Sequence, residues 1–293
     1  MTMFLTGSTG YLGSYYKKYL ELNKIRHFCI GRYITSNKNT LINFFKIHIN
    51  QEKGPFYLIN AAGFSGKPNV DGCEDHKREC LESNVILSSL LSEVCQELNI
   101  ILVHVSSGCV YNGYKKIWTE DDFSNFNFRA NNCSWYSGTK ALAEELLEDN
   151  KKSYILRLRF PFDSDLDSPR NYLRKLINYP KIVDSLNSIT NIQDFTNVTF
   201  DIINKNLPFG KYNIFNEGPV YTREVINILT KHLKLKDKDW FNSIEEFQKI
   251  VKAKRTNCVL STEKLKSFGI VLDNAYDSIE KSILKYKENK FGK

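Results

Sequence analysis

The stretch Phe4-Leu5-Thr6-Gly7-Ser8-Thr9-Gly10-Tyr11-Leu12-Gly13 decides the fold class of this chain. Its first three residues predict a short buried strand, and an amphipathic helix follows from Tyr15 to about Leu22. In such a strand–glycine–helix unit, Gly7 makes the tight turn, Gly10 lets backbone N–H groups approach phosphates, and Gly13 allows close helix–strand packing. The positive end of the helix dipole favours an anion there. The stretch therefore predicts a dinucleotide site, although glycines at this spacing also occur in purely structural turns.

The rest of the amino-terminal half alternates apolar runs with helical periodicity. Strands are predicted at His27–Ile30, Phe56–Ala62, Ile100–Val105 and Ser153–Leu158, and helices at Cys80–Leu98 and Tyr136–Glu148. This alternation is typical of βαβ units with right-handed crossovers. We predict an α/β fold with a Rossmann-type, doubly wound parallel sheet.

The pattern changes after Pro161, where a polar, loop-like segment and short elements follow. We therefore predict a dinucleotide-binding Rossmann domain over residues 1–160. Residues 161–293 are expected to form mainly a smaller substrate-binding domain, with part of the segment returning to the Rossmann sheet.

Composition narrows the class of protein. The chain has 293 residues, is 42% hydrophobic and 25% charged, and carries a formal net charge of +8. Its basic residues are interspersed with 33 acidic ones, which disfavours nucleic acid and suits an enzyme for anionic small molecules. The seven cysteines form no CxxC pair and the five histidines are scattered, so we expect reduced thiols, a cytoplasmic protein and no metal site. Neither a membrane span nor a signal peptide is predicted.

Arg32 follows the second predicted strand, about twenty residues after the glycines. An NAD site favours an acidic residue at this place for the ribose 2′-hydroxyl, whereas arginine offers a fork of donors to a 2′-phosphate. We therefore predict NADP(H) as the cofactor, against the alternative that Arg32 is an ordinary surface residue.

Tyr136 and Lys140 lie four residues apart, on one face of a predicted helix. Ser107 ends the fourth predicted strand and delivers a hydroxyl to the same edge of the sheet. Reduction of a carbonyl needs a proton donor to its oxygen, and we expect the Lys140 ammonium to lower the pKa of the Tyr136 phenol toward working pH. Ser107 would hold the carbonyl oxygen by a hydrogen bond.

At this point the chain resembles the extended short-chain dehydrogenases/reductases, whose motifs occur here in order as TGSTGYLG, NAAG from Asn60, SSGCVY from Ser106 and YSGTK from Tyr136. Further segments, including GKPNVD from Gly66, CEDH from Cys73 and LRLR from Leu156, are similar to the epimerase/reductase half of plant rhamnose synthases. The resemblance implies 3,5-epimerisation and 4-reduction of a nucleoside-diphospho-4-keto-6-deoxyglucose with NADPH, and a separate 4,6-dehydratase that supplies the substrate.

Epimerisation needs proton-transfer groups besides the reductase residues. Cys109 follows Ser107 by two positions, so on an extended strand it would face the same side; related epimerase/reductases carry a cysteine there. The resemblance offers Lys175 as the second group, although a solvated helix lysine is the alternative for Lys175 and a buried structural thiol for Cys109. Two other readings stay open: a 4-reductase without epimerase activity, and a non-catalytic NADP-binding regulatory subunit.

The resemblance also implies the remaining site residues. For the cofactor these are Gly7, Thr9, Gly10, Tyr11, Leu12, Arg32, Asn60, Ala61, Ala62, Tyr136 and Lys140. For the substrate they are Ser107, Gly108, Cys109, Asn171 and Arg255, the last of which would grip the diphosphate. The sequence does not reveal the oligomeric state, although the two long helices could pair two subunits in a homodimer, as they do in relatives.

Overall fold

The computed structural model describes residues 1–292, and the chain divides into two compact units. Unit 1 comprises residues 1–110, 126–157 and 206–212. Unit 2 comprises residues 111–125, 158–205 and 213–293, and residue 293 is not described. The chain therefore crosses between the units several times.

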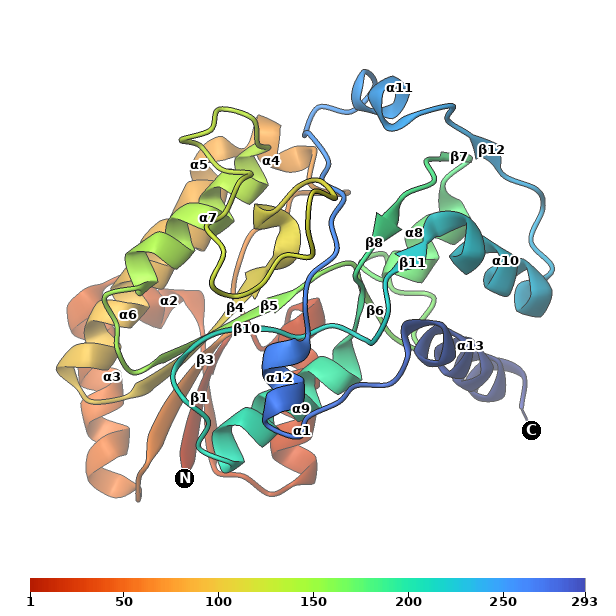
Figure 1. The fold of residues 1–293 in the computed structure, drawn as a ribbon. Helices are drawn as coiled ribbons and strands as arrows, with labels where there is room; N and C mark the ends of the chain where they lie inside the picture. Colours follow the sequence, from red (N-terminus) through yellow and green to blue (C-terminus); the bar gives the residue numbers. More distant parts are fainter. Residues whose placement is uncertain (293) are drawn as a thin grey trace. The chain divides into compact units, whose positions relative to one another are not determined.

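Unit 1 is built on a six-stranded sheet with the order β2-β1-β3-β4-β5-β10 (Figure 1). The strands are β1 (Thr2–Thr6), β2 (His27–Ile30), β3 (Phe56–Asn60), β4 (Ile101–Ser107), β5 (Ser153–Leu158) and β10 (Gly210–Asn213). β1 pairs in parallel with both β2 and β3, and β3 pairs in parallel with β4. The predicted Rossmann-type α/β fold is thus confirmed, and strand order reverses at β1, the place where such sheets bind ligands.

The helices of unit 1 cover both faces of this sheet (Figure 1). They are α1 (Tyr11–Leu22), α2 (Arg32–Thr35), α3 (Lys38–Gln51), α4 (Gly72–Asp75), α5 (Lys77–Leu81), the π-helical η1 (Glu82–Ile86), α6 (Leu87–Glu97), the 3₁₀ turn η2 (Gly108–Val110) and α7 (Trp135–Leu147). One apolar core joins α3, α6 and α7 to the sheet through buried residues such as Phe45, Leu91 and Leu147. Burial of such side chains is the main force that holds these layers together.

Unit 2 consists of short elements around a second apolar core. Its strands are β6 (Pro161–Phe162), β7 (Lys181–Ile182), β8 (Leu186–Asn187), β9 (Thr190–Asn191), β11 (Val220–Tyr221) and β12 (Asp239–Trp240), paired as β6-β9, β8-β11 and β7-β12. Its helices are α8 (Tyr172–Asn178), α9 (Ile192–Asn204), α10 (Thr222–Leu233), α11 (Ile244–Gln248), α12 (Glu263–Ser267) and α13 (Ala275–Phe291). Leu173, Leu229 and Ile279 bring α8, α10 and α13 into one buried cluster.

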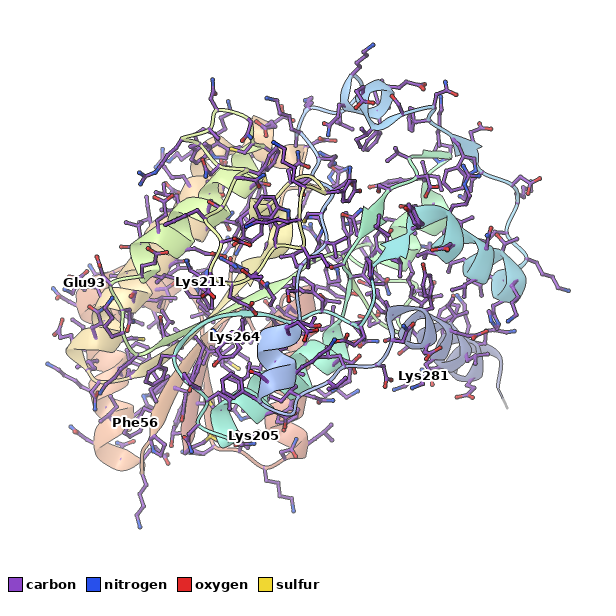
Figure 2. The ribbon with its side chains drawn as sticks, viewed as in Figure 1. Phe56, Glu93, Lys205, Lys211, Lys264 and Lys281 are labelled. Carbon is purple, nitrogen blue, oxygen red and sulfur yellow. The ribbon has the colours of Figure 1, made fainter. Side chains whose placement is uncertain are left out.

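Charged side chains lie at the surface of both units (Figure 2). Glu93 of α6 pairs with Lys38 at 2.6 Å, and Lys281 of α13 pairs with Asp273 at 2.7 Å. Such exposed pairs contribute little stability, because water and salt screen their attraction. None of the helices in residues 1–292 combines the length and the apolar composition that crossing a bilayer requires.

Candidate active site

The glycine turn between β1 and α1 fits a pyrophosphate closely. Gly7 has φ +71°, and a Cβ atom there would lie 2.6 Å from the backbone nitrogen of Ala62. A Cβ on Gly13 would lie 1.9 Å from the carbonyl oxygen of Gly7, so this glycine packs α1 against the turn rather than against the strand. Gly10 is the N-cap of α1, and its N–H donates to the Gly7 carbonyl at 2.9 Å. The turn can therefore present the amino-terminal N–H groups of α1, at Tyr11 and Leu12, to an anion.

The second half of this site is the turn that follows β3. Asn60 is fully buried, and its side-chain oxygen accepts hydrogen bonds from the Thr6 hydroxyl at 2.8 Å and the Ala62 N–H at 3.2 Å. Its amide nitrogen lies 3.1 Å from Nδ1 of His104, whose pKa is held well below its ordinary value by burial and by Lys140. The Asn60 side chain therefore holds the Ala61-Ala62 turn by a hydrogen bond, and the backbone of that turn lies against Gly7.

Arg32 lies directly after β2, as the first residue of α2. The residue is exposed, and its guanidinium makes no ion pair with any of residues 1–292. β2 runs parallel to β1, so Arg32 and the glycine turn lie at the same edge of the sheet. The residues at this edge fit a dinucleotide: a turn that begins and ends with glycine, a helix amino terminus, and an arginine at the end of the second strand.

The predicted reductase residues come together in unit 1. Ser107 ends β4, Tyr136 and Lys140 lie on α7, and the side chains of Tyr136 and Ser107 share a hydrogen bond. The Lys140 ammonium is buried and donates to the Val105 carbonyl of β4 at 3.0 Å. A Cβ atom on Gly63, in the turn after β3, would lie 3.8 Å from the same ammonium. The spacing seen in the sequence thus brings a phenol, an ammonium and a hydroxyl to one edge of the sheet.

The electrostatics of the phenol differ from the expectation. Burial raises the pKa of Tyr136 well above its usual value, the negative potential of Cys109 raises it further, and the hydrogen bond to Ser107 opposes both effects. The pKa of Lys140 is itself lowered by burial. The expected lowering of the Tyr136 pKa is therefore wrong, because burial disfavours the charged phenolate and is the largest of the effects on this group. The phenol is protonated at neutral pH, as a proton donor must be.

Cys109 lies beside Ser107 because of a backbone turn that the sequence did not predict. Strand β4 ends at Ser107, and residues Gly108–Val110 form a 3₁₀ turn, so the expected extended alternation from Ser107 to Cys109 is wrong. The turn instead folds back, and the Cys109 N–H donates to the Ser107 hydroxyl oxygen at 3.2 Å. Cys109 acts electrostatically on both Tyr136 and Lys140, which places its thiol among the reductase residues.

Two further thiols, of Cys73 and Cys80, lie near the Tyr136 phenol, and sequence reasoning missed both. They are hydrogen-bonded to each other, and each lies 3.9 Å from the carbonyl oxygen of Phe64. The contact with Cys73, together with Thr139, Lys140 and Asn84, lowers the pKa of Cys80 despite its burial. Cys73 stands in the CEDH segment that carried the family resemblance, which is the signal that could have found it.

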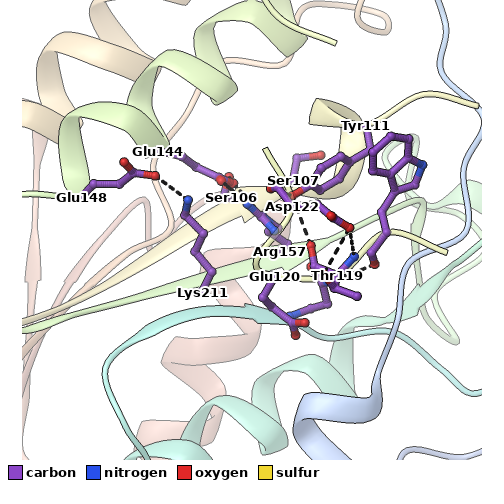
Figure 3. Close-up of polar contacts among 12 residues, drawn as sticks. Ser106, Ser107, Tyr111, Thr119, Glu120, Asp122, Glu144, Glu148, Arg157 and Lys211 are labelled. Atoms are coloured by element: carbon purple, nitrogen blue, oxygen red, sulfur yellow. Dashed lines mark hydrogen bonds and ion pairs between the residues drawn. The ribbon is translucent and has the colours of Figure 1, made fainter. Parts of the chain in front are cut away.

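A buried ion pair joins α7 to β5 next to Ser106 (Figure 3). Glu144 of α7 pairs with Arg157 of β5 at 2.5 Å and accepts a hydrogen bond from the Ser106 hydroxyl at 2.5 Å. Although burial favours the neutral acid, Arg157 and Ser106 hold the pKa of Glu144 below its ordinary value. Because Ser106 precedes Ser107, this network ties α7 and the carboxyl end of β4 to β5.

The substrate residues expected in the second half of the chain lie in unit 2. Lys175 lies on α8, and burial together with the positive charges of Arg170 and Arg255 lowers its pKa to about 8. Lys175 therefore lies within electrostatic reach of two arginines, and a bound anion would favour its protonated form.

Asn171 takes a different role from the predicted one. Its side-chain oxygen caps α8 by accepting from the Leu173 N–H at 2.9 Å, and its amide nitrogen donates to oxygens of Asp163 and Asp165. The residue is fully buried. Asn171 is thus a helix cap whose polar atoms are already bonded, rather than a side chain directed at a substrate.

Among residues 1–292, no three His, Cys, Asp or Glu side chains gather as a metal-ion site.

Comparison with known proteins identifies the family. A family model described as the RmlD substrate binding domain matches residues 1–288. The chain belongs to the RmlD family. It is 32% identical to the bifunctional dTDP-4-dehydrorhamnose 3,5-epimerase/dTDP-4-dehydrorhamnose reductase of Arabidopsis thaliana, over 96% of this chain and 90% of that protein. It is also 32% identical to a trifunctional UDP-glucose 4,6-dehydratase/UDP-4-keto-6-deoxy-D-glucose 3,5-epimerase/UDP-4-keto-L-rhamnose-reductase of the same plant, over 98% of this chain but 42% of that protein.

Solved structures agree on the fold of this RmlD family member. The UDP-rhamnose synthase L780 of Acanthamoeba polyphaga mimivirus is similar with a TM-score of 0.87 and 24% identity, over 97% of this chain and 99% of that one. A dTDP-4-dehydrorhamnose reductase of Bacillus anthracis in complex with NADP is similar with a TM-score of 0.79 and 16% identity, over 97% and 98%. The predicted resemblance to the epimerase/reductase half of plant rhamnose synthases is thereby confirmed, and with it an enzyme from a family of NAD(P)-dependent nucleotide-sugar reductases.

Proposed function

We propose that this chain is a bifunctional 3,5-epimerase/4-reductase that converts UDP-4-keto-6-deoxyglucose to UDP-L-rhamnose with NADPH. The observation that carries the proposal is the grouping of Cys109 with Ser107, Tyr136 and Lys140 at the carboxyl end of β4. A reductase needs the hydroxyl, phenol and ammonium, whereas the thiol is an additional acid or base. The plant relatives at 32% identity combine the same two activities.

The residues divide the reduction between them. Bound NADPH supplies a hydride to C4 of the sugar. Ser107 donates a hydrogen bond to the C4 oxygen and so polarises the ketone, and Tyr136 delivers a proton to that oxygen as the alcohol forms. Lys140 holds the carboxyl end of β4 through its hydrogen bond to the Val105 carbonyl. The C4 ketone gains one hydride and one proton, which balances the step.

Epimerisation uses the same polarised ketone. Hydrogen bonds to the C4 oxygen stabilise the enolate that forms when a proton leaves C3 or C5. Cys109 takes or returns a proton at one of these carbons, and a second group completes the exchange on the opposite face. Lys175 is proposed for that role, and its pKa of about 8 suits proton transfer near neutral pH.

NADPH rather than NADH is proposed because Arg32 is exposed beside the cofactor edge and carries no competing ion pair with residues 1–292. UDP is proposed because several plant relatives named for both activities act on UDP sugars, whereas another acts on the dTDP sugar. A 4,6-dehydratase must supply the 4-keto sugar in either case. A cytoplasmic location and a homodimer remain predictions.

Product analysis tests the proposal. The protein is incubated with NADPH and either UDP- or dTDP-4-keto-6-deoxyglucose, and the sugar formed is identified. L-rhamnose from the UDP substrate supports the proposal. Turnover only when the 3,5-epimerised 4-keto sugar is supplied, or a 4-reduced sugar that keeps the original C3 and C5 configurations, indicates a reductase without epimerase activity. No turnover of either the unepimerised or the epimerised substrates indicates a non-catalytic NADP-binding subunit.

Deuterium exchange tests the role of Cys109 separately. In heavy water without NADPH, the unmodified protein should exchange deuterium into the 4-keto sugar at both C3 and C5. Cys109→Ser keeps the size of the side chain but replaces the thiol with a much weaker acid, so exchange should slow sharply at one carbon at least. Reduction of an already epimerised substrate should survive, which is the internal control. Unchanged exchange in Cys109→Ser would remove the thiol from the mechanism.

A further inference from the structure

Arg159, which follows β5 in unit 2, is a buried arginine whose partners are all neutral. It is 4% exposed. Its guanidinium donates to the Asn187 side-chain oxygen at 2.8 and 3.1 Å, to the Thr256 hydroxyl at 2.7 Å, and to the Thr256 carbonyl. It also lies 4.5 Å from the centre of the Phe160 ring. No carboxylate among residues 1–292 pairs with it, although a buried charge without a counter-ion is costly.

The contacts of Arg159 fix the segment that carries Arg255. Thr256, which Arg159 holds by both its hydroxyl and its carbonyl, is 5% exposed. The Asn187 side-chain oxygen accepts hydrogen bonds from the Arg159 guanidinium and from the Cys258 N–H, the latter at 3.1 Å. Residues 256–258 are therefore held at both ends, Thr256 by Arg159 and Cys258 by Asn187 of β8. Gln248 holds the other side of Arg255 by hydrogen bonds to its backbone N–H at 3.0 Å and its carbonyl at 2.7 Å.

This segment joins Arg159 to the cationic cluster of unit 2. Arg255 acts electrostatically on Lys175, as does Arg170. On the other side of Arg159, Phe160 stacks on Tyr172, the first residue of the helix that carries Lys175, with ring centres 4.9 Å apart. The Arg159 guanidinium, which has no acidic partner among residues 1–292, thus contacts the segment of Arg255 through Thr256 and α8 through Phe160 and Tyr172.

We propose that Arg159 is a positioning residue for the substrate diphosphate, because its guanidinium fixes the Arg255–Thr256 backbone and adds a buried positive charge that the two phosphates neutralise. The inference rests on the proposed function, since it takes a nucleoside diphosphate as the substrate's anionic part. It goes further by assigning the electrostatic support of that diphosphate to a residue that does not itself grip it. The energetic cost of burying Arg159 is offset when the anion binds.

Comparison of UDP with uridine tests this role. Affinities of both ligands are measured by calorimetry for the unmodified protein and for Arg159→Met. Loss of the charge and of the Thr256 contacts should weaken UDP binding by about tenfold or more relative to uridine, which has no phosphates. Arg159→Lys retains the charge without the fork and should keep part of the difference. NADPH affinity, which depends on unit 1, should stay unchanged and reports that each variant is folded.

Arg223→Met is the matched control, because Arg223 is an exposed arginine of unit 2 that pairs with Asp184 at 3.3 Å. It should leave the ratio of UDP to uridine affinity unchanged. If UDP and uridine lose affinity by the same factor in Arg159→Met, or in Arg159→Lys where the methionine variant does not fold, the role is structural and the inference is overturned. If the unmodified protein binds NADPH but neither UDP nor dTDP, the proposed function fails instead, and the inference fails with it.

Discussion

At the scale of single residues, cofactor choice should depend on Arg32. Its exposed guanidinium can bind a 2′-phosphate through two donors, so NADPH should bind at least about tenfold more tightly than NADH, a difference of about 1.4 kcal/mol. Arg32→Asp places a carboxylate there and should abolish or reverse the preference. Dissociation constants for both cofactors measure this, with Lys18→Asp on α1 as a control of equal charge change. Equal affinities in the unmodified protein would contradict the assignment.

Tyr136 allows an equally direct test of the proton donor. Tyr136→Phe keeps the ring and its packing but removes the acid, so hydride transfer should slow by about 10²-fold or more. Because burial raises the pKa of the phenol, it stays protonated from neutral to moderately alkaline pH, and the unmodified rate should not fall in that range through loss of this proton. Single-turnover oxidation of NADPH measures the step. Near-normal turnover with unchanged NADPH binding would show that another group donates the proton.

The individual chemistry-bearing residues were predictable because their spacing places them. The spacing of four residues on a helix predicts that Tyr136 and Lys140 share one face, and the end of a strand predicts the place of Ser107. The roles of Cys73 and Asn171 were not predictable, because they depend on contacts with residues distant in the sequence or on a cap geometry that only the folded chain shows. The pKa of Tyr136 was misjudged since burial cannot be read from spacing.

At the scale of elements, both the β1–α1 unit and the helix at Cys80–Leu98 could be predicted, but the start of α1 at Tyr11 and an interruption within the second helix could not. That segment is α5, a π-helical turn at Glu82–Ile86, and α6. Within the turn, the Asn84 side chain accepts from the Phe64 N–H at 2.8 Å and donates to the Phe64 carbonyl at 2.9 Å. A side chain that binds a distant backbone is a tertiary cause, so helical periodicity alone misses such interruptions.

The glycine turn gives a prediction at this scale. Gly13→Ala should lower both the thermal stability and the NADPH affinity, because the new Cβ would lie 1.9 Å from the Gly7 carbonyl oxygen and force α1 away from the turn. Overpacking of this kind typically costs about 1–3 kcal/mol. Thermal unfolding and NADPH titration measure the two effects. Gly31→Ala is the control, since a Cβ there meets nothing within 4 Å. Wild-type behaviour of Gly13→Ala would show that helix α1 does not need this close approach.

At the scale of the whole molecule, the composition shows the net charge of +8, but it does not show that positive side chains gather in unit 2. Arg159, Arg170, Lys175 and Arg255 are spread over almost a hundred residues of sequence, and only the folding of unit 2 places Lys175 within reach of Arg170 and Arg255. A domain built from short elements and long connections leaves few periodic signals. Its anion-attracting character is therefore a property of tertiary structure.

This cluster predicts a pH dependence of nucleotide binding. Burial, Arg170 and Arg255 lower the pKa of Lys175 to about 8, and a bound anion favours its protonated form. UDP affinity should therefore be highest below about pH 8 and fall by several-fold as the pH rises to about 9.5, where the phosphates keep their charge. The stability of the free protein responds with the opposite sign: the unfolded chain holds this proton to higher pH, so the contribution of Lys175 to stability rises above about pH 8. Calorimetric UDP titrations should show the fall in the unmodified protein and a flatter profile in Lys175→Met, whereas parallel profiles in the two proteins would show that the charge of Lys175 does not affect nucleotide binding.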